Sequence, residues 1–203
     1  IAPDMVTAYQ ALGDDFRSIN RFDDAVLSYS SALDLMRGKN TTNWILYYSR
    51  GIAYEQLGDW INAEKDFRRA LEIKPDQPYV LNYLGYSLVE KQLKLEEALS
   101  LIEKAVSLRP DSGYIVDSFG WVLFRLSRFV EAVPHLEKAA KLMPVDPIVN
   151  DHLGDVYWAV GRKREARFQW NRALSFDPEA ADQVRIVKKL EIGLDQVLIE
   201  EGS

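Results

Sequence analysis

The sequence predicts an all-α fold built from about five copies of one repeat and followed by a C-terminal capping helix. Two observations carry this prediction. Five glycines, Gly13, Gly51, Gly85, Gly120 and Gly154, lie 38, 34, 35 and 34 residues apart. Two alanines and then a proline follow each of them at nearly constant distances, with an arginine in place of the first proline. Five copies of one spacing indicate an internal repeat.

Each recurring residue has a role in a helix pair. Small residues are expected where the first helix of a pair crosses close to the second. The recurring alanines are Ala25, Ala63, Ala98, Ala132 and Ala166, then Ala32, Ala70, Ala105, Ala139 and Ala173. Proline ends the second helix because it lacks an N–H and clashes with the preceding turn. These end positions are Arg37, Pro75, Pro110, Pro144 and Pro178.

This spacing resembles the tetratricopeptide repeat (TPR), a helix–turn–helix unit of about 34 residues. The second copy shows the pattern in Tyr47, Gly51, Tyr54, Ala63, Phe67, Ala70 and Pro75. The resemblance implies repeats over 6–43, with an extended loop, and over 44–77, 78–112, 113–146 and 147–180. The resemblance implies that these repeats stack into a single right-handed superhelical solenoid domain, because one repeat cannot bury its apolar face alone. We expect this domain to belong to a longer protein.

Some residues depart from the family pattern. Arg50 occupies a position where leucine is expected, and Asn150 replaces an aromatic residue. Extra residues near 38–42 predict a longer loop after the first repeat. After Pro178 the repeat stops but helical periodicity continues, which predicts a capping helix over 181–200 that Gly193 weakens or breaks.

Composition excludes several classes of function. The 203 residues are 47% hydrophobic and carry a formal net charge of −6, with no Cys and two His. No apolar run approaches the roughly 18 residues of a membrane-spanning helix. Cysteine-based metal sites are excluded, and the acidic balance argues against nucleic-acid binding. Without a phosphate-binding loop or a catalytic motif, we expect no enzyme, no metal and no cofactor.

In the TPR family, a concave groove is lined by one face of the first helices. The resemblance places Tyr48, Ile52, Tyr79, Asn82, Tyr86, Tyr114, Asp117, Trp121, Phe124, Arg125, Asp151, Asp155 and Trp158 in this groove. Exposed aromatic side chains in a groove favour the binding of a peptide with apolar anchors and basic residues. The alternative is that several of these aromatic residues pack against the next repeat.

Three other patterns have competing interpretations. One branch of the family binds the carboxylate of chaperone tails with a clamp of Lys, Arg and Asn side chains. The repeat positions that form this clamp contain no Lys or Arg in this sequence. His152, near Asp151 and Asp155, is read as an ordinary interface histidine in preference to a metal ligand. The basic residues Arg162, Lys163, Arg164, Arg167, Arg172, Arg185, Lys188 and Lys189 form either a solvated face or a contact for an acidic partner or anionic headgroups.

The favoured function is a protein-interaction scaffold that binds a protein or peptide segment. The stretches Asn82–Tyr86, Asp117–Leu123, His152–Asp155 and Gly161–Ala166 resemble bacterial cell-envelope TPR proteins. That group includes lipoprotein adaptors of carboxyl-terminal-processing proteases. It implies a periplasmic or outer-membrane-associated protein whose partners are a protease or its substrates, with no membrane span in this segment. The alternative is a self-associating homo-oligomer whose groove or ends are filled by a neighbouring chain, favoured by the apolar tail around Leu194–Ile199.

Overall fold

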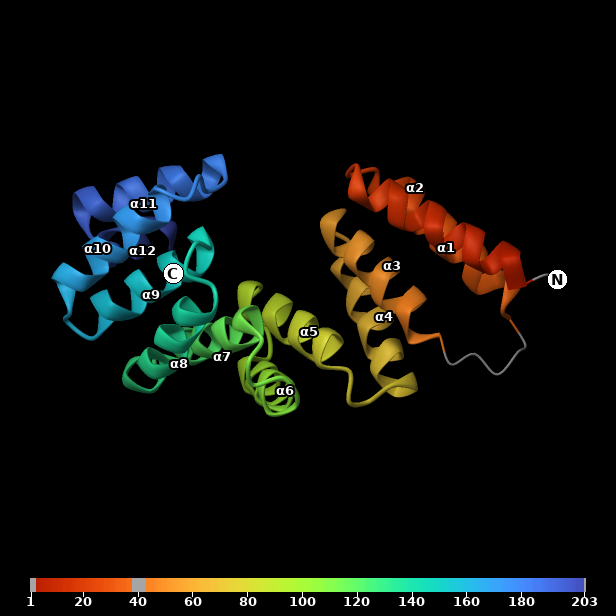
Figure 1. Cartoon of the computed structure of the whole chain (residues 1–203), viewed down its shortest axis with the longest axis horizontal. Coiled ribbons are helices and arrows are strands. Elements are labelled where there is room, and N and C mark those ends of the chain that lie inside the picture. The colour runs from red at the N-terminus through yellow and green to blue at the C-terminus, as the bar shows by residue number, and fades with distance from the viewer. Residues whose placement is uncertain (1–2, 38–42, 203) are drawn as a thin grey trace. The chain divides into compact units, whose positions relative to one another are not determined.

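The computed structural model describes residues 3–37 and 43–202, and within these residues every regular element is an α-helix (Figure 1). The helices are α1 (Pro3–Ser18), α2 (Phe22–Leu35), α3 (Trp44–Gln56), α4 (Trp60–Ile73), α5 (Pro78–Glu90), α6 (Leu95–Leu108), α7 (Gly113–Arg125), α8 (Phe129–Leu142), α9 (Pro147–Ala159), α10 (Lys163–Leu174), α11 (Ala180–Ile192) and α12 (Leu194–Glu201). The predicted all-α fold is confirmed. None of these helices is long and apolar enough to cross a membrane.

The chain divides into two compact units, Ile1–Leu84 and Gly85–Ser203, with the boundary inside α5. In the first unit, α1 packs on α2, α3 packs on α4, and α2 also contacts α3 (Figure 1). Its core contains the recurring alanines together with the fully buried rings of Tyr29 and Phe67. Each of these aromatic residues comes from the second helix of a pair and lies against the glycine of the first helix.

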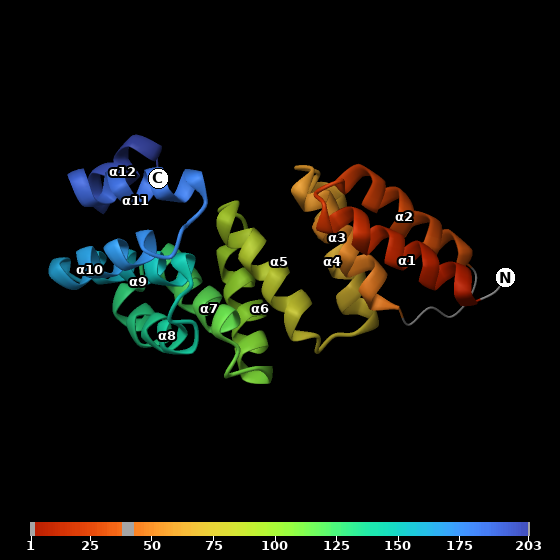
Figure 2. The same ribbon diagram turned by 45° about the horizontal axis from the view of Figure 1, so that its top comes forward.

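The second unit continues the same arrangement. α7 packs on α8, α9 packs on α10, and α11 contacts both α10 and α12 (Figure 2). Ile102, Leu136 and Trp170 are fully buried, and each faces a repeat glycine. At Gly154 an added Cβ would lie 2.4 Å from the Trp170 ring, so the two helices approach too closely for any side chain there. The glycine spacing in the sequence therefore marks the helix crossings.

We expect Gly154→Ala to destabilise the second unit by about 1–3 kcal/mol through overpacking. A loss of stability would distinguish a steric clash from helix propensity, because the same change at an ordinary helix position stabilises the protein by roughly 0.5–1 kcal/mol. Trp170 cannot move aside easily, since it is fully buried and its indole N–H donates to Asp155 at 2.8 Å. Urea unfolding measures the loss. Combination with Trp170→Leu should cost less than the sum of the two single changes, and strict additivity would contradict the proposed clash.

The loop after the first repeat and the capping segment after the last repeat are both predicted from the sequence. The expected long loop after the first repeat falls on residues 38–42, which lie outside the described residues. The capping helix expected over 181–200, with a weak point or break at Gly193, is two helices, α11 and α12. Gly193 separates them with φ of 86°, a left-handed conformation that side chains rarely adopt. An added Cβ at Gly193 would also lie 2.5 Å from the Trp158 ring, so the break brings the backbone close to α9.

Candidate functional site

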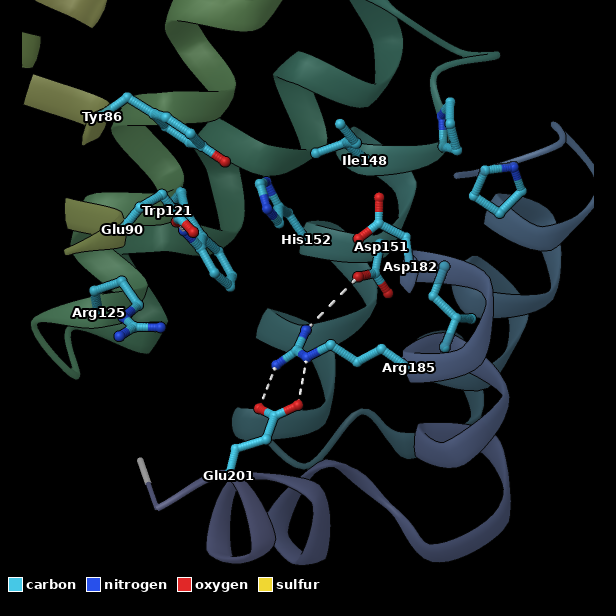
Figure 3. Close-up of a pocket in the computed structure, with 13 residues that line it drawn as sticks. Tyr86, Glu90, Trp121, Arg125, Ile148, Asp151, His152, Asp182, Arg185 and Glu201 are labelled. Carbon is cyan, nitrogen blue, oxygen red and sulfur yellow. Dashed lines mark hydrogen bonds and ion pairs between the residues drawn. The ribbon is translucent and has the colours of Figure 1, made fainter. Parts of the chain in front are cut away.

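A pocket of about 490 Å³ lies in the second unit, and we call it the Tyr86 pocket (Figure 3). Side chains from α5, α7, α9, α11 and α12 and from the segment before α11 line it. They are Tyr86, Glu90, Trp121, Arg125, Pro147, Ile148, Asp151, His152, Pro178, Asp182, Arg185, Ile186 and Glu201. Because successive first helices of the repeat lie next to one another, residues far apart in sequence meet here.

A stack of three parallel rings forms one wall of the pocket. Trp121 lies 4.9 Å from Phe124 on one face and 3.9 Å from His152 on the other, with interplanar angles of 8° and 11°. Its indole N–H donates to Glu90 Oε1 at 2.6 Å. Both faces of the Trp121 ring are covered by other rings, and its N–H edge is bonded to Glu90. Trp121 therefore forms a rigid wall of the pocket.

Asp117 of α7 fixes the position of His152 in the stack. Its Nδ1 lies 2.9 Å from Asp117 Oδ2, and both side chains are buried. Burial alone would lower the pKa of His152, but the charge and hydrogen bond of Asp117, aided by Asp151 and Asp155, raise it above its ordinary value. His152 thus stabilises the interface between α7 and α9, as the interface interpretation predicts for it.

The C-terminal side of the pocket contains a buried charge cluster. Lys189 is fully buried, and its Nζ donates to Asp151 Oδ1 and Oδ2 at 2.6 and 2.7 Å and to Asp155 Oδ1 at 2.7 Å. Arg185 lies 4.0 Å from Asp151 and forms a bidentate pair with Glu201 at 2.9 and 3.1 Å (Figure 3). It also approaches Asp155 at 3.6 Å. These ion pairs connect α9, α11 and α12.

The cluster predicts a specific dependence of stability on pH. Burial first, and then the neighbouring Asp155 charge, raise the pKa of Asp151 to about 6. A carboxyl whose pKa is raised on folding favours the folded state below its unfolded pKa of 3.8, and this contribution disappears as pH rises through about 6. We expect the wild type to lose on the order of 2 kcal/mol relative to Asp151→Asn between pH 4 and pH 7. Parallel urea titrations at several pH values measure the difference, and a constant difference would contradict the raised pKa.

The predicted groove residues are placed in different environments. Asn82, Asp117, Trp121, Phe124, Asp151, Asp155 and Trp158 are buried. Tyr79 and Tyr114 are exposed, and Tyr48, Ile52, Tyr86 and Arg125 are partly exposed. The Tyr86 pocket brings together Tyr86, Trp121, Arg125 and Asp151, whereas Tyr48, Ile52, Tyr79 and Asn82 belong to the first unit.

Two of the predicted groove residues, Tyr48 and Trp158, contact other parts of the chain. Tyr48 packs against the rings of Phe67 and Tyr83 at 6.2 and 5.9 Å. Trp158 donates its indole N–H to Asp195 at 2.9 Å and lies against Gly193. Packing against neighbouring helices was the alternative interpretation of these aromatic residues, and it describes both of them in this structure.

Sequence reasoning missed several pocket residues. Glu90 occupies the same repeat position as Arg125, and Ile148 occupies that of Tyr79 and Tyr114, so the repeat itself could have identified both. Asp182, Arg185 and Glu201 lie in the capping segment, where no repeat pattern exists to place them. The interpretation of Lys189 as part of a solvated basic face is wrong, because this side chain is fully buried between two carboxylates.

Comparisons with known proteins place the chain among TPR proteins. Tetratricopeptide repeat family models match residues 44–77 and 118–181. The TPR repeat-containing protein PA4667 of Pseudomonas aeruginosa is 37% identical over 110 residues, which are 54% of this chain and 18% of that protein. This chain therefore spans less than a fifth of that relative.

Two solved structures are similar in fold. TTC0263, a TPR protein of Thermus thermophilus, has a TM-score of 0.72 and 22% identity over 91% of this chain and 98% of that one. PilF of Pseudomonas aeruginosa has a TM-score of 0.75 and 18% identity over 97% of this chain and 90% of that one. The fold is that of a scaffold for protein–protein interaction. The chain belongs to the tetratricopeptide repeat family.

Proposed function

We propose that this chain is an adaptor that holds a segment of a partner protein on the groove-facing side of its first helices. The observation that carries the proposal is the Tyr86 pocket, which is lined by groove positions from α5, α7 and α9. Pockets that bind a specific segment combine apolar walls with a few polar groups in fixed positions. The Trp121 stack supplies such a wall, and Tyr86 and Arg125 supply polar groups at its edge.

The cellular setting of the proposal is the bacterial envelope. Its support is the resemblance of residues 82–86, 117–123, 152–155 and 161–166 to envelope adaptors, together with a bacterial relative at 37% identity. In this role the chain presents a carboxyl-terminal-processing protease, or a substrate of one, to its counterpart. Such an adaptor needs binding surfaces and no catalytic group of its own.

The proposal is tested by capture of partners from a bacterial envelope extract. Tyr86→Phe combined with Asp182→Asn removes two polar groups of the pocket while leaving the buried Trp121 stack intact. We expect at least a tenfold loss of captured partner, which corresponds to about 1.4 kcal/mol. The matched control is Tyr9→Phe with Asp15→Asn, which changes the same residue types outside the proposed groove. Equal capture by both folded variants and by the wild type would show that the groove assignment is wrong.

Self-association is the second candidate. The tail that favours it is partly used within its own unit, since Leu194 and Val197 are buried. Self-association is favoured by two apolar side chains on α11, since Val184 is 70% exposed and Val187 is 39% exposed. Light scattering after size-exclusion chromatography at several concentrations tests it, with Val184→Glu as the variant expected to abolish any dimer. A monomer at all concentrations rejects this candidate.

A further inference from the structure

The Tyr86 pocket contains polar groups that the described part of the chain leaves uncommitted. The Tyr86 hydroxyl has no hydrogen-bond partner there, and Arg125 and Asp182 have no ion-pair partner (Figure 3). Arg185, the other guanidinium of the pocket, is committed to Glu201 and Asp155. The lining has four carboxylates, from Glu90, Asp151, Asp182 and Glu201, and two guanidiniums. Asp151 is paired with the Lys189 ammonium and Glu201 with Arg185. Since Glu90 accepts the Trp121 indole N–H, this leaves Asp182 as the carboxylate without such a partner among the described residues.

The environment of the Tyr86 hydroxyl is acidic. Burial raises the pKa of Tyr86 above its ordinary value, and the charges of Glu90, Asp117 and Asp182 raise it further, with Arg125 acting in the opposite direction. Asp117 is 5% exposed, and its Oδ1 is buried without a hydrogen-bond partner in the described residues. Asp117 is not a lining residue, so it acts on the pocket through its charge, which together with the charges of Glu90 and Asp182 favours a cation near the Tyr86 hydroxyl.

The same unit already binds one cationic side chain on its groove side. Asp151 and Asp155 lie one helical turn apart on α9 and hold the ammonium group of Lys189 from α11. Asp117 occupies on α7 the repeat position that Asp151 occupies on α9. Carboxylates at this repeat position thus bind a lysine where the capping helix provides one. Among the described residues, Asp117 has His152 on one carboxylate oxygen and no hydrogen-bond partner on the other.

We propose that the Tyr86 pocket receives a lysine or arginine side chain from the partner segment. The proposal rests on the proposed binding of a protein segment and names the chemistry that this site selects. The cationic head of the side chain faces Glu90, Asp182 and the Tyr86 hydroxyl. Its aliphatic stem lies against Ile148, which is 48% exposed at the pocket. Long basic side chains commonly bind in this way, with the stem on apolar surface and the charge among polar groups.

The experiment is an NMR titration of the whole isotope-labelled chain with single blocked amino acids. The probes are Nα-acetyl-lysine methylamide, the same derivative of norleucine, which matches the stem without the charge, and that of glutamate. The readouts are the Trp121 indole N–H and the Ile148 amide. We expect saturable shifts with the lysine probe and at least fivefold weaker binding of the other two. Equal binding of norleucine, preferential binding of glutamate at Arg125, or no saturable shift would overturn the proposal.

Variants locate the effect within the pocket. Glu90→Gln with Asp182→Asn keeps an acceptor for the Trp121 indole and should weaken the lysine probe at least fivefold. Glu96→Gln with Glu103→Gln removes the same charge from α6, away from the lining residues, and should leave binding unchanged. Arg125→Met should strengthen binding of the lysine probe, because it removes a competing cation. A loss of binding in that variant would contradict the proposal.

The two proposals fail in different ways. If the wild type captures an envelope partner but the lysine probe neither binds nor displaces it, the basic side chain is rejected and the adaptor function stands. If the lysine probe binds at the Tyr86 pocket but no partner is captured, the adaptor function is rejected and the selectivity of the pocket stands.

Discussion

Replacement of Lys189 by methionine is expected to lower the free energy of unfolding of the second unit by about 3–5 kcal/mol. Methionine fills a similar volume but leaves Asp151 and Asp155 buried without their shared cation. Removal of one partner from a buried ion pair costs far more than the pair contributes as a whole, because the remaining charge is not solvated. Urea unfolding followed by hydrogen exchange in α9, α10 and α11 measures the loss where it occurs.

The loss should depend on pH, and a neighbouring lysine provides the control. At acidic pH the destabilisation by Lys189→Met should shrink, because Asp151, with its pKa raised to about 6, can become neutral by binding a proton. Lys188→Met removes an exposed pair with Glu200 and should cost less than about 1 kcal/mol. Similar effects of the two lysine variants, or a larger loss at pH 5 than at pH 8, would contradict the assignment of Lys189.

The helix pairs could be predicted because their sequence signal is local and repeated. At Gly120 and Gly154, an added Cβ would lie 2.5 and 2.4 Å from a side chain of the next helix, so the same steric requirement recurs in each pair. The requirement depends only on two neighbouring helices. A spacing of small residues in the sequence is therefore enough to predict the pairing and the order of the helices.

The site could be predicted only in part, because it depends on contacts that the repeat does not encode. The repeat predicts which positions of α9 face a groove, but the capping segment that contacts Asp155 and Trp158 has no repeat spacing. In the sequence, Lys189 belongs to a run of basic residues that looks like a solvated surface. In the structure, Lys189 is paired with Asp155 and Asp151, which lie 34 and 38 residues earlier in the chain. The chain turns at Gly193 shortly after this lysine.

A departure from the family pattern leads to the second large effect. Arg50 replaces the expected leucine on α3 and forms a bidentate pair with Asp66 of α4, at 2.7 and 2.9 Å. It also donates to Ser30 Oγ at 3.0 Å and lies near the rings of Tyr47 and Tyr54. The side chains of Arg50 and Asp66 are 18% and 5% exposed, so the pair is largely removed from water.

Restoration of leucine at position 50 should therefore destabilise the first unit, although it restores the family pattern. Arg50→Leu leaves the Asp66 carboxylate buried without its partner, and we expect a loss of about 3–5 kcal/mol in urea unfolding. Arg50→Leu combined with Asp66→Leu replaces both charges by apolar groups and should recover most of that loss, since an apolar pair of similar volume often equals a buried ion pair in stability. Losses that simply add in the double variant would mean that Arg50 and Asp66 act independently. Recovery would instead show that the departure at position 50 is compensated by the carboxylate it pairs with across the helix crossing.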